Sequence, residues 1–176
     1  MTRTARILVA GTLMAAGLAV FPSVTVAAPA STSFDVVGVE TAFTSTSASF
    51  TGKARGDAGD RGAWTTSITR TPFTPTGQST VTGGSFAMKT VSPSWTTDFV
   101  TGTVSGGFVQ RLPGPPGCTN ETFGVTVQLT NVVTSTTAGG TGRFLGVLTH
   151  YRAVIFGACR TYFASIAGQV AFDYTP

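Results

Sequence analysis

The fold class is decided by the segment Val125-Thr126-Val127-Gln128-Leu129-Thr130. Its apolar and polar residues alternate strictly. In a β-strand, this order places the three aliphatic side chains on one face and the three polar side chains on the other. The segment therefore predicts a strand with one face in a core and one face in water.

The same character extends over the rest of the chain. Residues 80–91, 95–112 and 165–174 also alternate, and threonine, valine and phenylalanine are abundant while leucine and charged helix formers are scarce. Thr, Val and Phe lose side-chain freedom in a helix but fit a pleated sheet. The paired glycines Gly83-Gly84 and Gly106-Gly107 interrupt two of these segments and predict bulges or sharp bends.

Over the whole mature chain, such segments give roughly seven or eight short strands with short, glycine-rich connections, which form either a sandwich or a closed barrel. The paired glycines favour the barrel, because strands that close on themselves must tilt and bend, and closure removes exposed sheet edges. We therefore predict an all-β fold, a single antiparallel, calycin-like β-barrel of eight strands or nearly so.

An export signal precedes this domain. Arg3 and Arg6 form a basic start, the uncharged apolar run 7–21 has the length of a signal-peptide core, and small residues at 28–30 suit a signal peptidase. Residues 25–27 offer an alternative cleavage site.

The resulting prediction is a cleaved signal peptide at 1–30 and one barrel domain at 31–176. A membrane-spanning helix needs about 20 apolar residues, and no further stretch of that kind follows. We therefore expect a secreted, extracellular protein with no stable membrane insertion after cleavage.

The charge of the mature chain is small. The whole chain has eleven basic and seven acidic residues, a net charge of +4, and losing Arg3 and Arg6 leaves nine against seven, or +2. The basic residues are scattered along the sequence and form no block. Neither a nucleic-acid partner nor binding to a charged membrane surface is therefore expected.

Cys118 and Cys159 form an even pair in an exported domain, which most simply means one disulfide. The bond would close a loop of about forty residues and stabilise the fold by roughly 3–4 kcal/mol. The alternatives are a metal pair or a catalytic thiol. A metal site needs further Cys or His ligands, and the chain offers only His150. We therefore predict the disulfide and no metal or cofactor.

The segment 139–144, Gly-Gly-Thr-Gly-Arg-Phe, resembles the Gly-Gly-Thr-Gly-x-Phe stretch that joins two strands in allene oxide cyclase and dirigent-type barrels. Gly-Gly-Ser-Phe at 83–86 and the last apolar strand are also similar, so the resemblance covers residues 79–174. It extends to secreted actinobacterial barrels of unknown role. The resemblance implies an eight-stranded antiparallel barrel, and no segment matches the plant active-site patterns, so no catalytic residue is assigned.

Two residues are candidates for ligand binding. Alternation along 144–156 separates Tyr151 from His150 and Arg152, and we expect His150 to point outward as a surface histidine and Tyr151 to point into the barrel. A buried tyrosine hydroxyl needs a hydrogen-bond partner, which a bound ligand could supply. The alternative is that Tyr151 simply packs in the core. Arg143 lies near a strand end, where an arginine at a barrel mouth can hold a carboxylate.

Two functions follow as hypotheses. In the first, the barrel is non-catalytic and either binds a small apolar ligand or acts as an extracellular interaction module. In the second, it is a cyclase, isomerase or dirigent-type coupling-control protein whose cavity orients a reactive substrate. We favour the first. The resemblance adds a homo-oligomer as one option, because related barrels associate, and the sequence leaves the oligomeric state open.

The two hypotheses differ in what fills the barrel. The second predicts an open cavity with a few inward polar groups, whereas the first, in its interaction-module form, predicts a barrel filled by apolar side chains. The expected filling residues are Phe86, Val127, Leu129, Val147, Ile155, Val170 and Phe172.

Overall fold

The computed structural model describes residues 30–174, so the predicted signal peptide, apart from Ala30, lies outside the described residues. No helix in the described part of the chain is long and apolar enough to cross a membrane. The strands are β1 (Ala30–Phe43), β2 (Ser47–Gly56), β3 (Arg61–Arg70), β4 (Gln78–Val91), β5 (Thr97–Arg111), β6 (Glu121–Val133), β7 (Ala138–Ile155) and β8 (Ala158–Tyr174).

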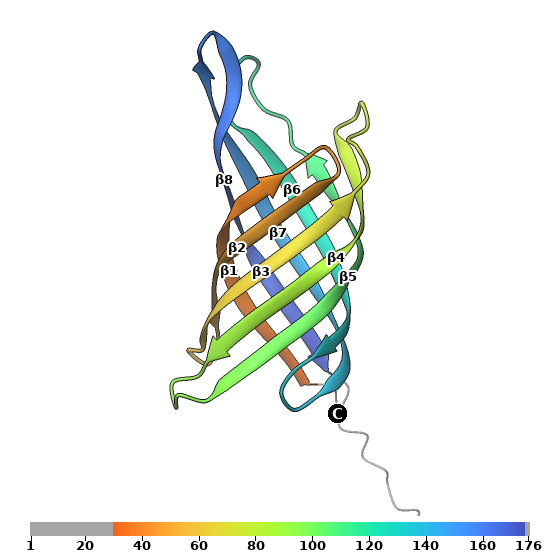
Figure 1. Ribbon diagram of the computed structural model, residues 1–176, viewed down its shortest axis with the longest axis vertical. Coiled ribbons are helices and arrows are strands. Elements are labelled where there is room, and N and C mark those ends of the chain that lie inside the picture. The colour runs from red at the N-terminus through yellow and green to blue at the C-terminus, as the bar shows by residue number, and fades with distance from the viewer. Residues whose placement is uncertain (1–29, 175–176) are drawn as a thin grey trace, which may run out of the picture.

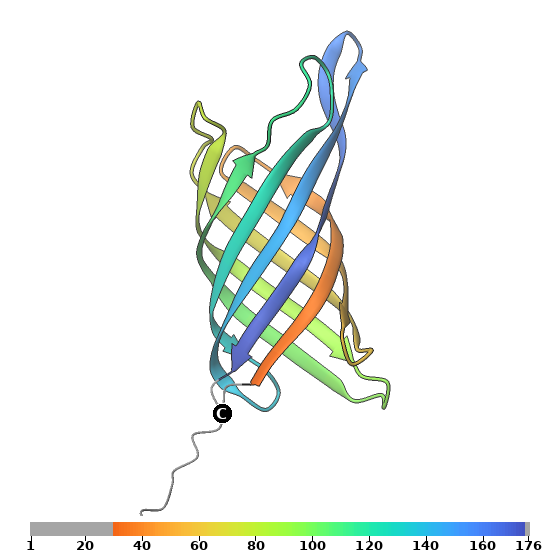
Figure 2. The ribbon, with the colours of Figure 1, turned by 180° about the vertical axis from the view of Figure 1, so that it is seen from behind.

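Each strand pairs with the next, antiparallel, and β1 pairs with β8 to close the sheet into a barrel (Figures 1 and 2). Closure satisfies the backbone groups that an open sheet would leave at its two edges. The prediction of an all-β, antiparallel barrel of eight strands is confirmed.

The register of the sheet shifts beside each pair of glycines, which agrees with the predicted bulges. Gly84 and Gly107 have φ angles of 142° and 135°, and a Cβ on either residue would overlap a carbonyl oxygen of a neighbouring strand. The register shifts between Val104 and Gly106, beside the second of these glycines. The two glycines therefore let neighbouring strands approach closely where the barrel wall bends.

Apolar side chains fill the barrel from wall to wall. Five of the seven residues expected to fill it are buried, and the exceptions are Val147, which is 44% exposed, and Ile155, which lies near the tip of the β7–β8 hairpin outside the core. The buried aromatic side chains are Phe34, Phe50, Trp64, Phe86, Phe123 and Phe172.

The two faces of β7 are inverted relative to the prediction. His150 is buried with Leu148, whereas Tyr151 is only partly buried and shares the outer face with Val147. The strand carries aliphatic residues on both faces, so its alternation does not identify the core side. Glu40 of β1 contacts His150 inside the barrel, and this contact offsets the cost of burying the histidine.

The predicted disulfide is formed between Cys118 and Cys159, whose Cα atoms lie 5.5 Å apart. It ties the connection between β5 and β6 to the β7–β8 hairpin, which projects past the end of the barrel at the top of Figure 1. Both partners therefore lie at one end of the molecule.

Candidate functional site

The structure does not bring the two predicted ligand-binding residues together. Tyr151 lies on the outer face of β7, where its ring centroid is 5.5 Å from that of Phe163 and its hydroxyl is 3.5 Å from Ser165 Oγ. Arg143 is exposed, eight residues earlier on the same strand, which corresponds to about 26 Å. Their proposed ligand roles stay predictions.

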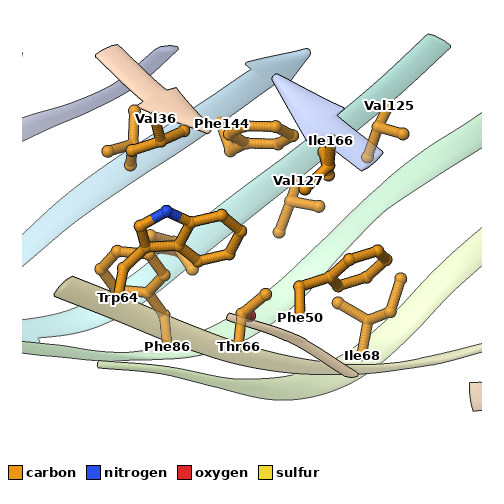
Figure 3. A pocket seen from close by; sticks show the side chains of 12 residues that line it. Val36, Phe50, Trp64, Thr66, Ile68, Phe86, Val125, Val127, Phe144 and Ile166 are labelled. Carbon is orange, nitrogen blue, oxygen red and sulfur yellow. The ribbon is translucent and has the colours of Figure 1, made fainter. Parts of the chain in front are cut away.

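Two small cavities lie inside the barrel formed by the described residues. The larger one, of about 30 Å³, is lined by apolar side chains apart from Thr66. Figure 3 shows Phe50, Trp64, Phe86 and Phe144 among the side chains that line this cavity. Ligand pockets typically measure roughly 300–1,000 Å³, so this space is closer to that of a water molecule than to that of a ligand.

A polar cluster lies inside the barrel toward the hairpin end. His150 Nε2 lies 3.1 Å from Glu40 Oε2, and each side chain is only 7% exposed. The other carboxylate oxygen of Glu40 has no hydrogen-bond partner among the described residues. The pair borders a second cavity, of about 20 Å³, so it has no room for a substrate inside the barrel.

Arg70 completes this cluster. Its guanidinium donates hydrogen bonds to the carbonyl oxygen of Thr44 at 3.2 Å and to Ser79 Oγ at 3.4 Å. The ring centroid of Phe73 lies 4.5 Å away. Burial lowers the pKa of Arg70, and the nearby charge of Glu40 opposes that shift. The positive charge of Arg70 therefore lies near the buried carboxylate of Glu40, and the cluster fills the barrel interior at this end.

At the opposite end, hydroxyl side chains, Asp98 and Tyr174 line an open depression of about 460 Å³. Burial favours a higher pKa for Asp98, but hydrogen bonds from Ser135 and from the Phe99 amide outweigh it and lower the pKa. Burial, together with the charge of Asp98, raises the pKa of Tyr174 to about 12. Asp98 accepts the Ser135 amide at 3.0 Å, so it holds the β6–β7 turn in place.

The outer surface near this end carries a basic row. Lys53 of β2 and Lys89 of β4 lie on either side of Ala63 of β3 in one cross-strand row. One step further along, Arg55 and Arg61 lie directly opposite each other on β2 and β3. All four cations are exposed on the outer face of three adjacent strands, although 36 residues separate the first from the last in the sequence.

Trp95 flanks this basic row. It lies in the turn between β4 and β5, is 87% exposed and has a φ of 66°, which is unusual for a bulky residue. The turn is held by the Trp95 amide donating to the Ser92 carbonyl oxygen at 2.9 Å. Together with Lys53, Arg61 and Lys89 it lines a groove of about 780 Å³, which we call the basic groove.

The cations of the basic groove have no acidic partner in the described part of the chain. The ion pairs found there involve Arg111, His150 and Arg152, and none involves Lys53, Arg61 or Lys89. Lys89 instead lies over the ring of Phe99, with its Nζ 5.5 Å from the centroid. The groove therefore presents unpaired positive charge beside an exposed aromatic side chain.

Comparison with known proteins adds no functional assignment. No family model matches the chain, and no curated protein or solved structure matches it significantly. The resemblance to allene oxide cyclase and dirigent-type barrels thus rests on the short segments quoted above.

Sequence reasoning missed both the Glu40–His150 pair and the basic groove. Glu40 has the same parity in its strand as the buried Val36, a pattern that points it inward. No local signal identifies the groove, because its residues come from three strands and two turns, and only the pairing of the strands brings them together.

Proposed function

We propose that this protein is an exported, non-catalytic interaction module that binds an acidic polysaccharide in the basic groove. The observation that carries the proposal is the set of unpaired cations beside the exposed Trp95. The small internal cavities favour this form of the hypothesis over an apolar ligand or a cyclase substrate held inside the barrel.

An anionic partner explains an otherwise unfavourable charge arrangement. Like charges directly opposite each other on neighbouring strands destabilise a sheet, as Arg55 and Arg61 are expected to do. Asp35 pairs with Arg55 on its other side, but Arg61 has no comparable acidic neighbour among its strand partners. A bound anion would neutralise this repulsion, whereas an empty groove retains it.

The shape of the groove favours a sugar chain over other polyanions. Gly62 and Ala63 also line the groove, and their small size leaves room for a flat ring. Trp95 can cover the C–H face of a pyranose, and Lys53 and Lys89 lie two strands apart, about 10 Å, to meet successive acidic groups. Single-stranded nucleic acid would call for several stacking aromatics and a more basic chain.

Tryptophan fluorescence tests the proposal directly, because the other tryptophan, Trp64, is 3% exposed. The mature chain is titrated with a polyuronic acid, with neutral dextran as the control. We expect a saturable change that salt weakens and that Trp95→Phe abolishes. Lys53→Gln/Lys89→Gln should weaken binding at least tenfold, about 1.4 kcal/mol.

Arg160→Gln is the matched control, since Arg160 is an exposed cation on the β7–β8 hairpin, at the opposite end of the barrel from the groove (Figure 1). It should leave polyuronate binding unchanged. Equal binding of dextran and polyuronate, or an unaffected Lys53→Gln/Lys89→Gln variant, would overturn the proposal. Tighter binding of single-stranded DNA than of polyuronate would replace the polysaccharide with a nucleic acid.

A further inference from the structure

The β7–β8 hairpin ends in a bulky residue that contacts no other part of the described chain. Phe156 and Gly157 form its two-residue turn, with φ angles of 51° and 76°, and Phe156 is 100% exposed. Two-residue turns with both φ values positive strongly favour Asn-Gly or Asp-Gly. Phenylalanine at the first position is therefore unfavourable for the turn and for solubility alike.

Backbone outliers of this kind persist where the surrounding structure enforces them, and they cluster at binding and functional sites. Here the enforcement comes from β7 and β8, which pair up to Ile155 and Ala158, and from the disulfide at Cys159. The hairpin projects beyond the barrel end (Figure 1), and Phe156 lies in its turn, between the paired residues Ile155 and Ala158.

Further apolar side chains surround the tip on both sides of the hairpin. Val154 is 66% exposed and Tyr162 63%, and Phe163 is 46% exposed nearer the barrel. An apolar patch on one side would suit a pocket in a partner protein. Apolar side chains exposed at the tip and on both sides of the hairpin instead suit insertion into a lipid layer, which would surround the hairpin.

The charge at this end of the molecule is positive. Residues 151–163 contain Arg152 and Arg160 and no acid, and the facing connection 112–120 has no charged residue. Arg152 lies 2.7 Å from Glu121 Oε1, and Arg111 lies 3.7 Å from the same oxygen, so this single carboxylate meets two cations. Arg160 is exposed and makes no ion pair in the described part of the chain.

We propose that the β7–β8 hairpin docks reversibly on an anionic lipid bilayer, with Phe156 inserted into the interfacial region and Arg160 facing the lipid headgroups. Aromatic side chains with flanking arginines are suited to that region, where one end is apolar and the other is wet. The disulfide orders the hairpin in advance, so docking loses little conformational freedom. This surface is separate from the basic groove, and the inference does not depend on the proposed function.

Phe156→Asn provides a sharp test, because Asn-Gly is the favoured sequence for this turn. The melting temperature should stay equal to that of the wild type or rise, so a loss of binding cannot be attributed to misfolding. Co-sedimentation with phosphatidylglycerol-containing vesicles should weaken by about tenfold or more. Lys89→Gln, in the basic groove, is the control and should bind these vesicles like the wild type.

Arg160→Gln separates the electrostatic contribution to vesicle binding from the contribution of the inserted Phe156 side chain. It should weaken binding to phosphatidylglycerol vesicles severalfold and leave the weaker binding to pure phosphatidylcholine unchanged. The inference is overturned if the wild type does not sediment with either vesicle, or if Phe156→Asn sediments as well as the wild type. A wild-type dimer that Phe156→Asn converts to a monomer, without vesicle binding, would assign the tip to a second copy of the chain.

Discussion

His150 and Glu40 place two ionisable side chains inside a barrel that is otherwise filled with apolar groups. Burying a carboxylate is costly, and the imidazole of His150 offsets that cost only while it is present. Arg70 contributes a positive charge nearby and is held by backbone and hydroxyl oxygens. The cluster is therefore sensitive to the loss of any single member.

We expect His150→Leu to lower the free energy of unfolding by about 3–5 kcal/mol, because it leaves the Glu40 carboxylate buried without its closest partner. The double variant Glu40→Met/His150→Leu should lose less than the sum of the two single variants. Urea unfolding of the four proteins in this cycle measures the coupling. Additivity within about 0.5 kcal/mol would contradict it.

Tyr174 provides a prediction about pH. Its pKa is raised to about 12, first by burial and then by the charge of Asp98, so its ionised form is disfavoured in the folded state. The stabilisation linked to the neutral form should be fully present below the ordinary tyrosine pKa of about 10 and be lost as pH rises toward 12.

A phenolate absorbance titration should show a component that ionises near pH 12. Tyr174→Phe should remove this component and so identify it. Asp98→Asn should lower the pKa of Tyr174, because it removes the neighbouring charge. A Tyr174→Phe variant that keeps the component near pH 12 would contradict the assignment.

At the scale of the strands, glycine positions control how closely neighbouring strands approach. A Cβ on Gly107 would overlap the carbonyl oxygen of Thr126, whereas a Cβ on Gly139 would meet no atom within 4 Å. Both residues have positive φ angles, 135° and 90°, so both substitutions carry backbone strain. Only the substitution at Gly107 adds a steric clash within the barrel wall.

Gly107→Ala should therefore lower the free energy of unfolding by more than about 2 kcal/mol, and Gly139→Ala by about 1 kcal/mol. Chemical denaturation of the two variants under the same conditions measures the difference. If both variants lose the same free energy of unfolding, the strands beside Gly107 can move apart to fit a Cβ, and the strained backbone conformation alone accounts for the loss.

The strands also show what local patterns can and cannot predict. Residues 125–130 have aliphatic side chains on one face only, and their predicted orientation agrees with the buried Val125, Val127 and Leu129. In β7 both faces carry aliphatic residues, and the deciding polar residue, His150, has its partner on a distant strand. Orientation was predictable where one face is clearly polar, and it failed where a long-range ion pair reversed the expected burial.

At the scale of the whole molecule, the antiparallel barrel and the disulfide were predictable, because turn glycines, strand periodicity and an even cysteine count are local or compositional signals. The two candidate binding surfaces were not predictable from the sequence. The basic groove depends on which strands are neighbours, and the hairpin surface depends on how far β7 and β8 extend past the barrel. Trp95 and Phe156 share one unusual property: each is a bulky, exposed aromatic residue with a positive φ angle in a turn. Their turns lie at opposite ends of the barrel (Figures 1 and 2).

This separation predicts that one molecule can hold both proposed partners at once. A filled, closed barrel lies between the two turns, and it gives neither site a flexible connection to the other. Binding at one end should therefore leave affinity at the other end unchanged within about twofold, since coupling between sites requires a shared conformational change.

Sedimentation of phosphatidylglycerol vesicles with labelled polyuronate tests this. The polymer should pellet only when the protein is present. Trp95→Ala should release polymer while the protein stays on the vesicles, and Phe156→Asn should release both from the pellet. If polyuronate instead displaces the protein from vesicles, both anions compete for one surface, and the assignment of separate partners to the two ends is wrong.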